Sequence, residues 1–410
     1  MVGDFSEDRT YLPQLRLLVE EVCTELCRFE HALTDGISPE AVRIDREYPL
    51  ERPDAFADIR VAPAGLPAYV IEVKLGYGRV QLLQSLRRKF LEPGPRLAGT
   101  QRVVLVVDTR HYSDWPQLEV ELADCVHPSL KLEVWDESRL LKLLNEKFHV
   151  NIPAITADNL LDVRQSIDRT HGFHAFGGKS LAEYDHDPLK AELLWHFGFW
   201  KIQALRNGGR SNPRDILPPG QYRGVAVVLA DLCSFSSYVR DTPDSEVVRE
   251  SLTSFYSKAR YQILHNGGML YQFVGDEVIG LFGVPEGSAG FPQAALDTAR
   301  ALVSIGNSVS HHWQRQIDRV QASGGVHVGL AMGDLQIVSL RPFSRTHVGA
   351  VGDCINVAAR LMGLAGPSEI VVSNSFHQAL DEADKSCFQE QEPVEAKNIG
   401  RIKAWKLSPG

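Results

Sequence analysis

Short apolar strands alternate with longer amphipathic helices along the C-terminal half of the chain. Residues 225–230 (Val-Ala-Val-Val-Leu-Ala) form an unbroken apolar run, which is typical of a central strand covered on both faces. Apolar side chains then recur at helical spacing from Val248 to Ile263, and Gly267-Gly268 ends that helix. The pattern therefore begins with a buried strand followed by a helix.

Five further segments of this half predict regular elements, in the order strand 269–274, strand 277–282, helix 292–313, strand 326–331 with more strand near 336 and 347, and a helix from 352. Gly275-Asp276, between the first two strands, is the signal of a two-residue hairpin. The order β-α-β-β-α-β predicts an α+β domain with a split, ferredoxin-like arrangement over residues 223–410.

The rest of the sequence divides into two parts. Residues 1–167 are expected to form an α/β domain, in which the runs 69–74 and 102–107 predict strands with a helix between them. Residues 168–222 are rich in glycine, histidine and proline, which favours a connector between the two domains. Within this connector, residues 188–205 predict a helix with apolar side chains on one side.

Composition narrows the class of protein. The 410 residues carry a net charge of −9, which argues against a large nucleic-acid-binding surface but leaves a local basic groove open. No apolar run reaches the roughly 20 residues needed to cross a bilayer, and the acidic N-terminus is unlike a signal peptide. The six cysteines are too scattered for a disulfide scaffold, so Cys23 and Cys27 are expected to be buried thiols. A cytoplasmic protein is predicted.

Two aspartates lie where predicted strands end. Asp231 directly follows the apolar run 225–230, and Asp276 lies in the hairpin. In a βαββαβ sheet the end of the first strand and the hairpin turn can lie side by side, so the two carboxylates are expected to converge. Such a pair suits two hard divalent cations, Mg²⁺ or Mn²⁺. Taken singly, Asp231 could instead be a capping residue and Asp276 an ordinary hairpin aspartate.

Asn356 and Arg360 add a pair of donors. They lie four residues apart on the predicted helix 354–362 and therefore project from one face. A planar guanidinium beside an amide suits a charged phosphoryl transition state and a ribose. The interleaved apolar residues are expected to hold the helix against the core: Ile355, Val357, Ala358 and Leu361.

Three segments together carry a specific resemblance. They are Asp231-Leu232-Cys233-Ser234-Phe235-Ser236, Phe273-Val274-Gly275-Asp276-Glu277 and Val351-Gly352-Asp353-Cys354-Ile355-Asn356-Val357-Ala358-Ala359-Arg360. In this order and spacing they resemble the signature segments of the class III adenylate and guanylate cyclases. The resemblance implies an enzyme that converts a nucleoside triphosphate into its 3′,5′-cyclic monophosphate and diphosphate with two divalent metal ions, Mn²⁺ or Mg²⁺.

The resemblance assigns roles position by position. Asp231 and Asp276 match the metal-binding aspartates of the family, with the Leu232 carbonyl as a further ligand. The phosphates would be cradled by the main-chain amides of Cys233, Ser234 and Phe235.

Arg360 matches the arginine that stabilises charge at the α-phosphorus, and Asn356 matches the asparagine that orients the ribose. In the family the aspartates come from one protomer and the asparagine and arginine from the other. The resemblance therefore implies a head-to-tail homodimer with two sites.

The base-reading positions depart from those of the purine cyclases. Adenylate cyclases have a lysine, and guanylate cyclases a glutamate, where this chain has Gln272, preceded by Tyr271, and the second position falls on Gly349. These changes alter the polarity and volume of the base pocket, which disfavours ATP and GTP. His327 stands where some members have an arginine, which leaves Lys397 as a phosphate contact.

The pattern is more like that of the bacterial pyrimidine cyclases of antiphage Pycsar systems, which make cyclic UMP or cyclic CMP as an alarm for a separate effector protein. UTP is favoured over CTP, although the amide of Gln272 suits either base. The alternatives are a cytidylate or adenylate cyclase, or a non-catalytic nucleotide-binding regulator with the same fold.

The N-terminal domain carries a second, shorter motif. Glu72 and Lys74 lie two apart on a predicted strand and point to one face, and Asp58 lies on a neighbouring strand. The three residues resemble the core of the PD-(D/E)xK nucleases, in which the acids bind Mg²⁺ and the lysine assists the attacking water. A restriction-endonuclease-like domain with a vestigial site, serving as a sensor or scaffold, is favoured over an active nuclease. A surface Glu-Lys pair is the remaining alternative.

Overall fold

The chain divides into two compact units, residues 1–171 and 172–410. The computed structural model describes residues 11–177, 188–287, 290–318, 323–340, 347–396 and 400–408. Among these residues, no helix combines the length and the apolar character that a membrane span needs.

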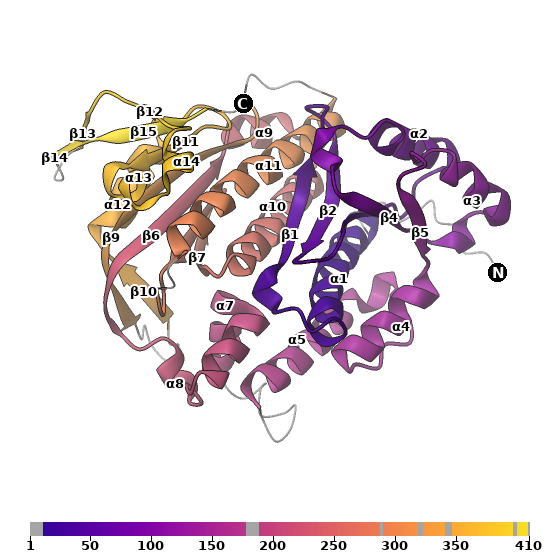
Figure 1. Ribbon diagram of the computed structural model, residues 1–410, viewed down its shortest axis with the longest axis horizontal. Helices are drawn as coiled ribbons and strands as arrows, with labels where there is room; N and C mark the ends of the chain where they lie inside the picture. Colours follow the sequence, from indigo (N-terminus) through magenta and orange to yellow (C-terminus); the bar gives the residue numbers. More distant parts are fainter. Residues whose placement is uncertain are drawn as a thin grey trace. The chain divides into compact units, whose positions relative to one another are not determined.

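The first unit is built on a five-stranded sheet in the order β1-β2-β3-β4-β5 (Figure 1). The strands are β1 (Val42–Pro49), β2 (Phe56–Pro63), β3 (Ala68–Val73), β4 (Thr100–Val106) and β5 (Lys131–Trp135). β1, β2 and β3 are antiparallel neighbours, whereas β3, β4 and β5 run parallel. Parallel neighbours need crossover connections, which α2 (Arg79–Phe90) and α3 (Trp115–Ala123) supply.

Helices complete this unit. Leu82, Leu86 and Phe90 of α2 join a buried cluster with strand residues such as Val70 and Val103. The longest helix, α1 (Tyr11–Leu33), contacts the three antiparallel strands and packs with α4 (Glu137–Phe148), and α5 (Leu160–Phe176) follows. The expected burial of both α1 thiols, Cys23 and Cys27, is confirmed.

The second unit contains the predicted βαββαβ domain. Its four central strands are β6 (Gly220–Leu232), β7 (Met269–Val274), β8 (Glu277–Phe282) and β9 (Val326–Leu340). They lie in the order β9-β6-β8-β7, and every neighbouring pair is antiparallel. The α+β class and the ferredoxin-like strand order are therefore confirmed for this half of the chain.

Additional strands widen the sheet. β10 (His347–Val351) pairs with β9, and on the other side of β9 come β11 (Ile370–Ser373), β15 (Ala404–Leu407) and β12 (Gln389–Glu390). A separate pair is formed by β13 (Val394–Ala396) and β14 (Gly400–Ile402). The strands expected over 326–331 and near Gln336 are one continuous strand, because β9 pairs with β6 along its length and then with β10.

Helices cover both faces of this sheet. α10 (Ser245–His265) and α11 (Phe291–Ile317) run side by side and share a core with Ala226, Val228 and Ala230 of β6 (Figure 1). On the other face, α12 (Asp353–Met362) approaches β9 so closely that a Cβ on Gly329 would lie 2.2 Å from the Ala358 carbonyl oxygen. Only glycine fits at this contact.

Within the described part of this unit, the other α-helices are short, apart from α7 (Pro188–Asn207). The short ones are α8 (Pro213–Ile216), α9 (Phe235–Asp241), α13 (Asn374–Ala379) and α14 (Glu382–Lys385). The helix expected over 188–205 is present as α7 (Pro188–Asn207), with a non-helical residue inside it at Gly198 (φ 71°, ψ 173°).

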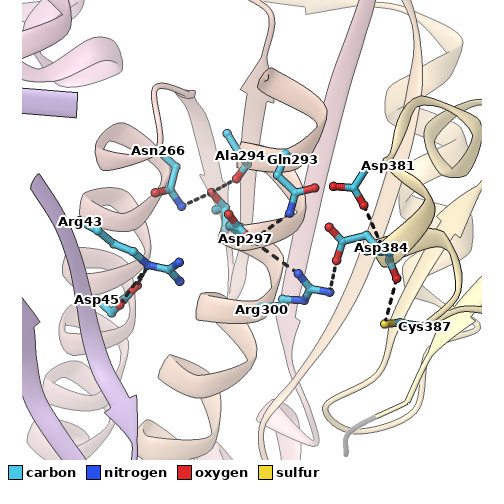
Figure 2. Close-up of polar contacts among 12 residues, drawn as sticks. Arg43, Asp45, Asn266, Gln293, Ala294, Asp297, Arg300, Asp381, Asp384 and Cys387 are labelled. Carbon is cyan, nitrogen blue, oxygen red and sulfur yellow. Dashed lines mark hydrogen bonds and ion pairs between the residues drawn. The ribbon is translucent and has the colours of Figure 1, made fainter. Parts of the chain in front are cut away.

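Ion pairs tie α11 to its surroundings. Arg300 binds the Asp384 carboxylate of α14 at 2.6 Å and lies 3.5 Å from Asp297, to which Gln293 also donates at 3.2 Å (Figure 2). Asp381 caps α14 by accepting from the Asp384 amide at 2.8 Å (Figure 2).

Candidate active site

Asp231 and Asp276 lie together at one end of the central strands. Asp231 is the second-last residue of β6 and pairs with Glu277, the first residue of β8. The turn before β8 is tight, with Val274 opposite Glu277 and a positive φ of 64° at Gly275. Asp276, the second residue of this turn, lies near enough to the Asp231 carboxyl group to raise its pKa. The structure thus brings the two side chains together, and their role as metal ligands stays a prediction.

This end of the sheet concentrates negative charge. Burial, together with the neighbouring Asp276 and Glu277 side chains, raises the pKa of Asp231 to about 7. Burial and Asp276 also raise the pKa of Glu277. Carboxylates crowded in this way are stabilised by a cation, and hard divalent ions prefer oxygen ligands. The donor set therefore fits the predicted metal ions, with Leu232 directly after Asp231.

The described part of the chain contains no group of three or more His, Cys, Asp or Glu side chains arranged to hold a metal ion. The predicted set contains only two carboxylates and a main-chain carbonyl. Phosphate oxygens of a substrate would have to complete the coordination.

Two residues beside Asp231 were not among the predicted metal ligands. Glu277 pairs with Asp231 from β8, and His327 pairs with it from β9. His327 donates from Nδ1 to the Ala365 carbonyl oxygen at 2.7 Å, because a carbonyl can only accept. Nε2 is therefore the ring nitrogen left for other partners. Glu277 could have been suspected from its place next to Asp276 in the sequence. Its pairing with Asp231, however, is visible only in the folded sheet.

α12 presents the predicted donor pair on its outer face. Asn356 and Arg360 are both exposed. In the described residues, neither makes a hydrogen bond or ion pair with the aspartates of the same chain. The described part of the structure thus shows no direct bond between the donor pair and the carboxylates of the same chain, and the roles of Asn356 and Arg360 stay predictions.

The packing residues of α12 differ in part from the prediction. Ala358 and Leu361 are buried as expected, but Ile355 and Val357 are only half-buried, and Cys354 is the third buried residue. Positions 354, 358 and 361 form one stripe at helical spacing, and the stripe faces the sheet. Ile355 and Val357 flank it.

A β-bulge shapes the predicted base-reading segment. Leu270 pairs with Gly280 and Gln272 with Ile279, so Tyr271 is an extra residue in β7. Phe273 then packs against the same core as Leu270, which places Gln272 on the opposite face. Without the bulge, alternation along the strand would turn Gln272 into the core.

Tyr271 also connects β7 with β10. Its hydroxyl accepts a hydrogen bond from the Ala350 amide at 3.1 Å. Ala350 follows Gly349, which is buried and paired with Val338 of β9. The structure thus brings Tyr271 next to the second base-reading position, and base recognition itself stays a prediction.

The predicted phosphate contacts have different environments. The Cys233 amide already donates to the Gly325 carbonyl oxygen at 3.0 Å, so it is not free to bind a phosphate in this structure. Ser234, with a φ of 58°, and Phe235 follow it at the start of α9 and remain candidates. Lys397 lies outside the described residues.

The first unit also brings its three predicted residues together. Lys74 Nζ lies 2.8 Å from Asp58 Oδ2 and 2.6 Å from Glu72 Oε2. A fourth residue, which the sequence did not indicate, is Lys89 of α2, whose Nζ lies 2.7 Å from Glu72 Oε2. Glu72 and Lys74 are buried, so the alternative of a surface Glu-Lys pair is wrong.

Charge is balanced within this cluster. Burial raises the pKa of Asp58, but Lys74 and Lys89 outweigh that effect and hold it below its usual range. Burial, followed by the Asp58 charge, raises the pKa of Glu72. Although burial disfavours an ammonium group, the two carboxylates hold the pKa of Lys74 well above its usual value. Two lysines thus balance the charge of the two carboxylates.

Comparison with known proteins identifies the second unit. Residues 217–409 match the family model described as the adenylate and guanylate cyclase catalytic domain. An uncharacterized protein of Mycobacterium tuberculosis is 29% identical over 157 residues, which are 38% of this chain and 26% of that protein. A second one is 27% identical over 177 residues, or 43% of this chain and 31% of that protein. The matches thus span about a third or less of these relatives.

Solved structures with a similar domain include the guanylyl cyclase Cya2 (20% identity, TM-score 0.41, covering 46% of this chain and 93% of that one). Another is the adenylyl cyclase CyaB from P. aeruginosa (17% identity, TM-score 0.42, covering 47% and 97%). The C-terminal half of this chain contains a class III adenylate and guanylate cyclase catalytic domain.

Proposed function

We propose that the C-terminal domain is a nucleotide cyclase that converts UTP into 3′,5′-cyclic UMP and diphosphate. The observation that carries the proposal is the convergence of Asp231 and Asp276, with a pKa of about 7 at Asp231. Two carboxyl groups held so close that one has a strongly raised pKa are typical of sites that bind cations and phosphates. The matched catalytic-domain family supports the same chemistry.

Asp231, Asp276 and the Leu232 carbonyl are the residues that would hold two divalent ions. Bound there, the ions would lower the pKa of the ribose 3′-hydroxyl and bind the triphosphate. Asp231 would lose its proton when its site is filled, because a bound cation favours the carboxylate form.

Asn356 and Arg360 would act from a second copy of the chain. Both are exposed on α12 and have no contact with their own aspartates among the described residues, so a head-to-tail homodimer would complete two sites. There Arg360 would donate to the oxygens of the α-phosphate as charge develops, and Asn356 would orient the ribose. Loss of one such donor typically reduces the rate by about 10²–10³.

The choice of UTP rests on the base-reading segment. Gln272 has a neutral amide where purine cyclases carry a charged side chain, and Gly349 has no side chain at the second position. The bulge at Tyr271 places Gln272 on the face away from the core, where a base could reach it. An amide can both donate to and accept from a pyrimidine edge.

The decisive experiment is incubation of the purified chain with each ribonucleoside triphosphate and Mn²⁺, with products separated by chromatography. Cyclic UMP as the main product supports the proposal. Cyclic CMP or cyclic AMP as the main product would show that CTP or ATP is the substrate instead of UTP. Absence of every cyclic product would favour a non-catalytic nucleotide-binding regulator. The Asp231→Ala variant should form no product, whereas Glu72→Ala should remain active.

We further propose that the cyclic nucleotide is a signal for a separate effector protein in antiviral defence, as the resemblance to pyrimidine cyclases implies. The N-terminal domain would then serve as a sensor or scaffold. Expression in bacteria challenged with phage tests this role, because Asp276→Ala should abolish both cyclic nucleotide and protection.

A further inference from the structure

The N-terminal unit contains a cavity of about 360 Å³ beside the Asp58–Glu72–Lys74–Lys89 cluster. Its walls come from the β1–β2 turn, the last turn of α2 and the segment that follows α2. Five basic residues line it: Arg52, Arg87, Arg88, Lys89 and Arg96. Only two acidic residues, Glu51 and Glu92, do so. A local excess of positive charge therefore exists in a chain whose net charge is −9.

The arginines of this pocket are largely unneutralised. Among the described residues, the side chains of Arg52, Arg87 and Arg96 have no ion-pair partner, whereas Arg88 pairs with Asp54. Glu51 accepts from the main-chain amide of Arg96 at 2.7 Å. Arg52, Arg87 and Arg96 are exposed and line the same cavity, so an anion bound there would offset their positive charge.

Lys89 connects the pocket to the buried cluster. It lines the cavity, yet its Nζ binds Glu72 at 2.7 Å and lies 3.8 Å from Asp58. The carboxylates are therefore neutralised by Lys74 and Lys89 and cannot cancel the charge of the arginines. The same pairing offsets the negative charge that would favour Mg²⁺ at these two carboxylates.

We propose that this pocket binds a phosphate group through Arg52, Arg87 and Arg96, so that the N-terminal unit recognises a phosphorylated nucleotide or nucleic-acid end without cutting it. Guanidinium groups match phosphate oxygens in fork geometry and keep their charge at any physiological pH. A cavity of about 360 Å³ accommodates a nucleotide-sized group.

Binding can be measured by fluorescence anisotropy on the full chain, with a labelled single-stranded DNA that carries a 5′-phosphate. EDTA in the buffer prevents metal-dependent binding at the cyclase site. The Arg52→Gln/Arg87→Gln variant should bind at least about tenfold more weakly, with a salt slope reduced by about 0.7 per lost phosphate contact. Lys131→Gln, an exposed charge of β5 outside the pocket, is the matched control and should bind normally.

Three competitors identify the source of the phosphate. Displacement by inorganic phosphate supports the proposal in either form. If a nucleoside monophosphate displaces the labelled DNA as well as the 5′-phosphorylated oligonucleotide does, the ligand is a free nucleotide. If the monophosphate is weaker and the 5′-hydroxyl oligonucleotide does not bind, the ligand is the phosphorylated end of a nucleic acid. Lack of binding by every phosphate probe overturns the proposal, and so does unchanged binding by the double variant. Arg96→Gln provides a second, independent variant, and urea unfolding checks that each variant is folded.

Discussion

The Tyr271 hydroxyl on β7 accepts a hydrogen bond from the Ala350 amide on β10 at 3.1 Å. This bond joins the two segments that carry Gln272 and Gly349, the proposed base-reading positions. Loss of the acceptor leaves the Ala350 amide without its partner, which typically costs about 1–3 kcal/mol where the group is buried.

Tyr271→Phe should therefore reduce kcat/KM for UTP about tenfold and relax discrimination among the four triphosphates. Steady-state kinetics with each nucleotide measure both effects. Tyr222→Phe is the matched control, because the Tyr222 hydroxyl donates to the Pro218 carbonyl at 2.8 Å outside this segment. Wild-type selectivity in Tyr271→Phe would show that this bond does not shape the base pocket.

The raised pKa of Asp231 predicts a pH-dependent stability for the metal-free protein. The pKa is about 7 in the folded chain, well above the ordinary aspartate value of 3.8. Between these values the folded state holds a proton that the unfolded chain has released, so stability falls as pH rises through this window and levels off above it. Asp231→Asn should remove the loss of stability that comes from this carboxyl group. The Tm of both proteins, measured from pH 4.5 to pH 8 in about 1 mM EDTA, tests this.

Asp318→Asn is the control for the pH experiment. Asp318 is exposed and has a φ of 50°, a conformation that asparagine also tolerates. Identical pH profiles for wild type and Asp231→Asn would contradict the assigned pKa. Added Mn²⁺ should raise the Tm of the wild type and have little effect on the Asp231→Asn variant.

Two inactive variants should restore activity to each other. Asp276→Ala removes a carboxylate and Arg360→Ala removes the donor, so each homodimer is inactive. When the two are co-expressed, half of the dimers are mixed and each mixed dimer has one intact site of two. Cyclase activity should therefore reach about one quarter of the wild-type value.

The matching control co-expresses the Asp231→Ala chain with the Asp276→Ala chain. Both substitutions remove a metal-binding carboxylate, so every site in a mixed dimer lacks one carboxylate and no activity should return. Activity in this control, or none in the Asp276→Ala/Arg360→Ala mixture, would disprove the division of the site between two chains.

The buried cluster of the N-terminal unit predicts a large loss of stability for Lys74→Ala. The change leaves Asp58 and Glu72 near each other with Lys89 alone, and breaking a buried ion pair typically costs about 3–5 kcal/mol. Urea unfolding of the N-terminal unit measures it. Lys131→Ala, at an exposed position, should change the free energy of unfolding by less than about 0.5 kcal/mol.

Much of the cyclase fold could be predicted from local sequence. The run 225–230, the helical spacing up to Ile263 and the Gly275-Asp276 turn each specify their element through neighbouring residues. The strand order then follows from the few topologies that such an order of elements permits. Convergence of Asp231 and Asp276 was predictable for the same reason.

Other features depend on contacts between distant segments. The bulge at Tyr271 accompanies the packing of Phe273, whose ring stacks on Tyr256 of α10 with centroids 4.1 Å apart. Lys89 joins Glu72 only because α2 folds back over β3, and the intervening sequence carries no sign of this. The register that sets His327 opposite Asp231 likewise exists only in the assembled sheet.

The contact between Gly329 and Ala358 has a consequence for mutations that touch no reacting group. α12 carries Asn356 and Arg360 on the side opposite its contact with the sheet, so the helix backbone fixes how far these side chains extend. Even an alanine at position 329 would push α12 outward and shift both donors relative to a neighbouring chain. In the proposed homodimer, a substitution at the centre of the sheet would therefore lower cyclase activity by misplacing donors that act on the other chain.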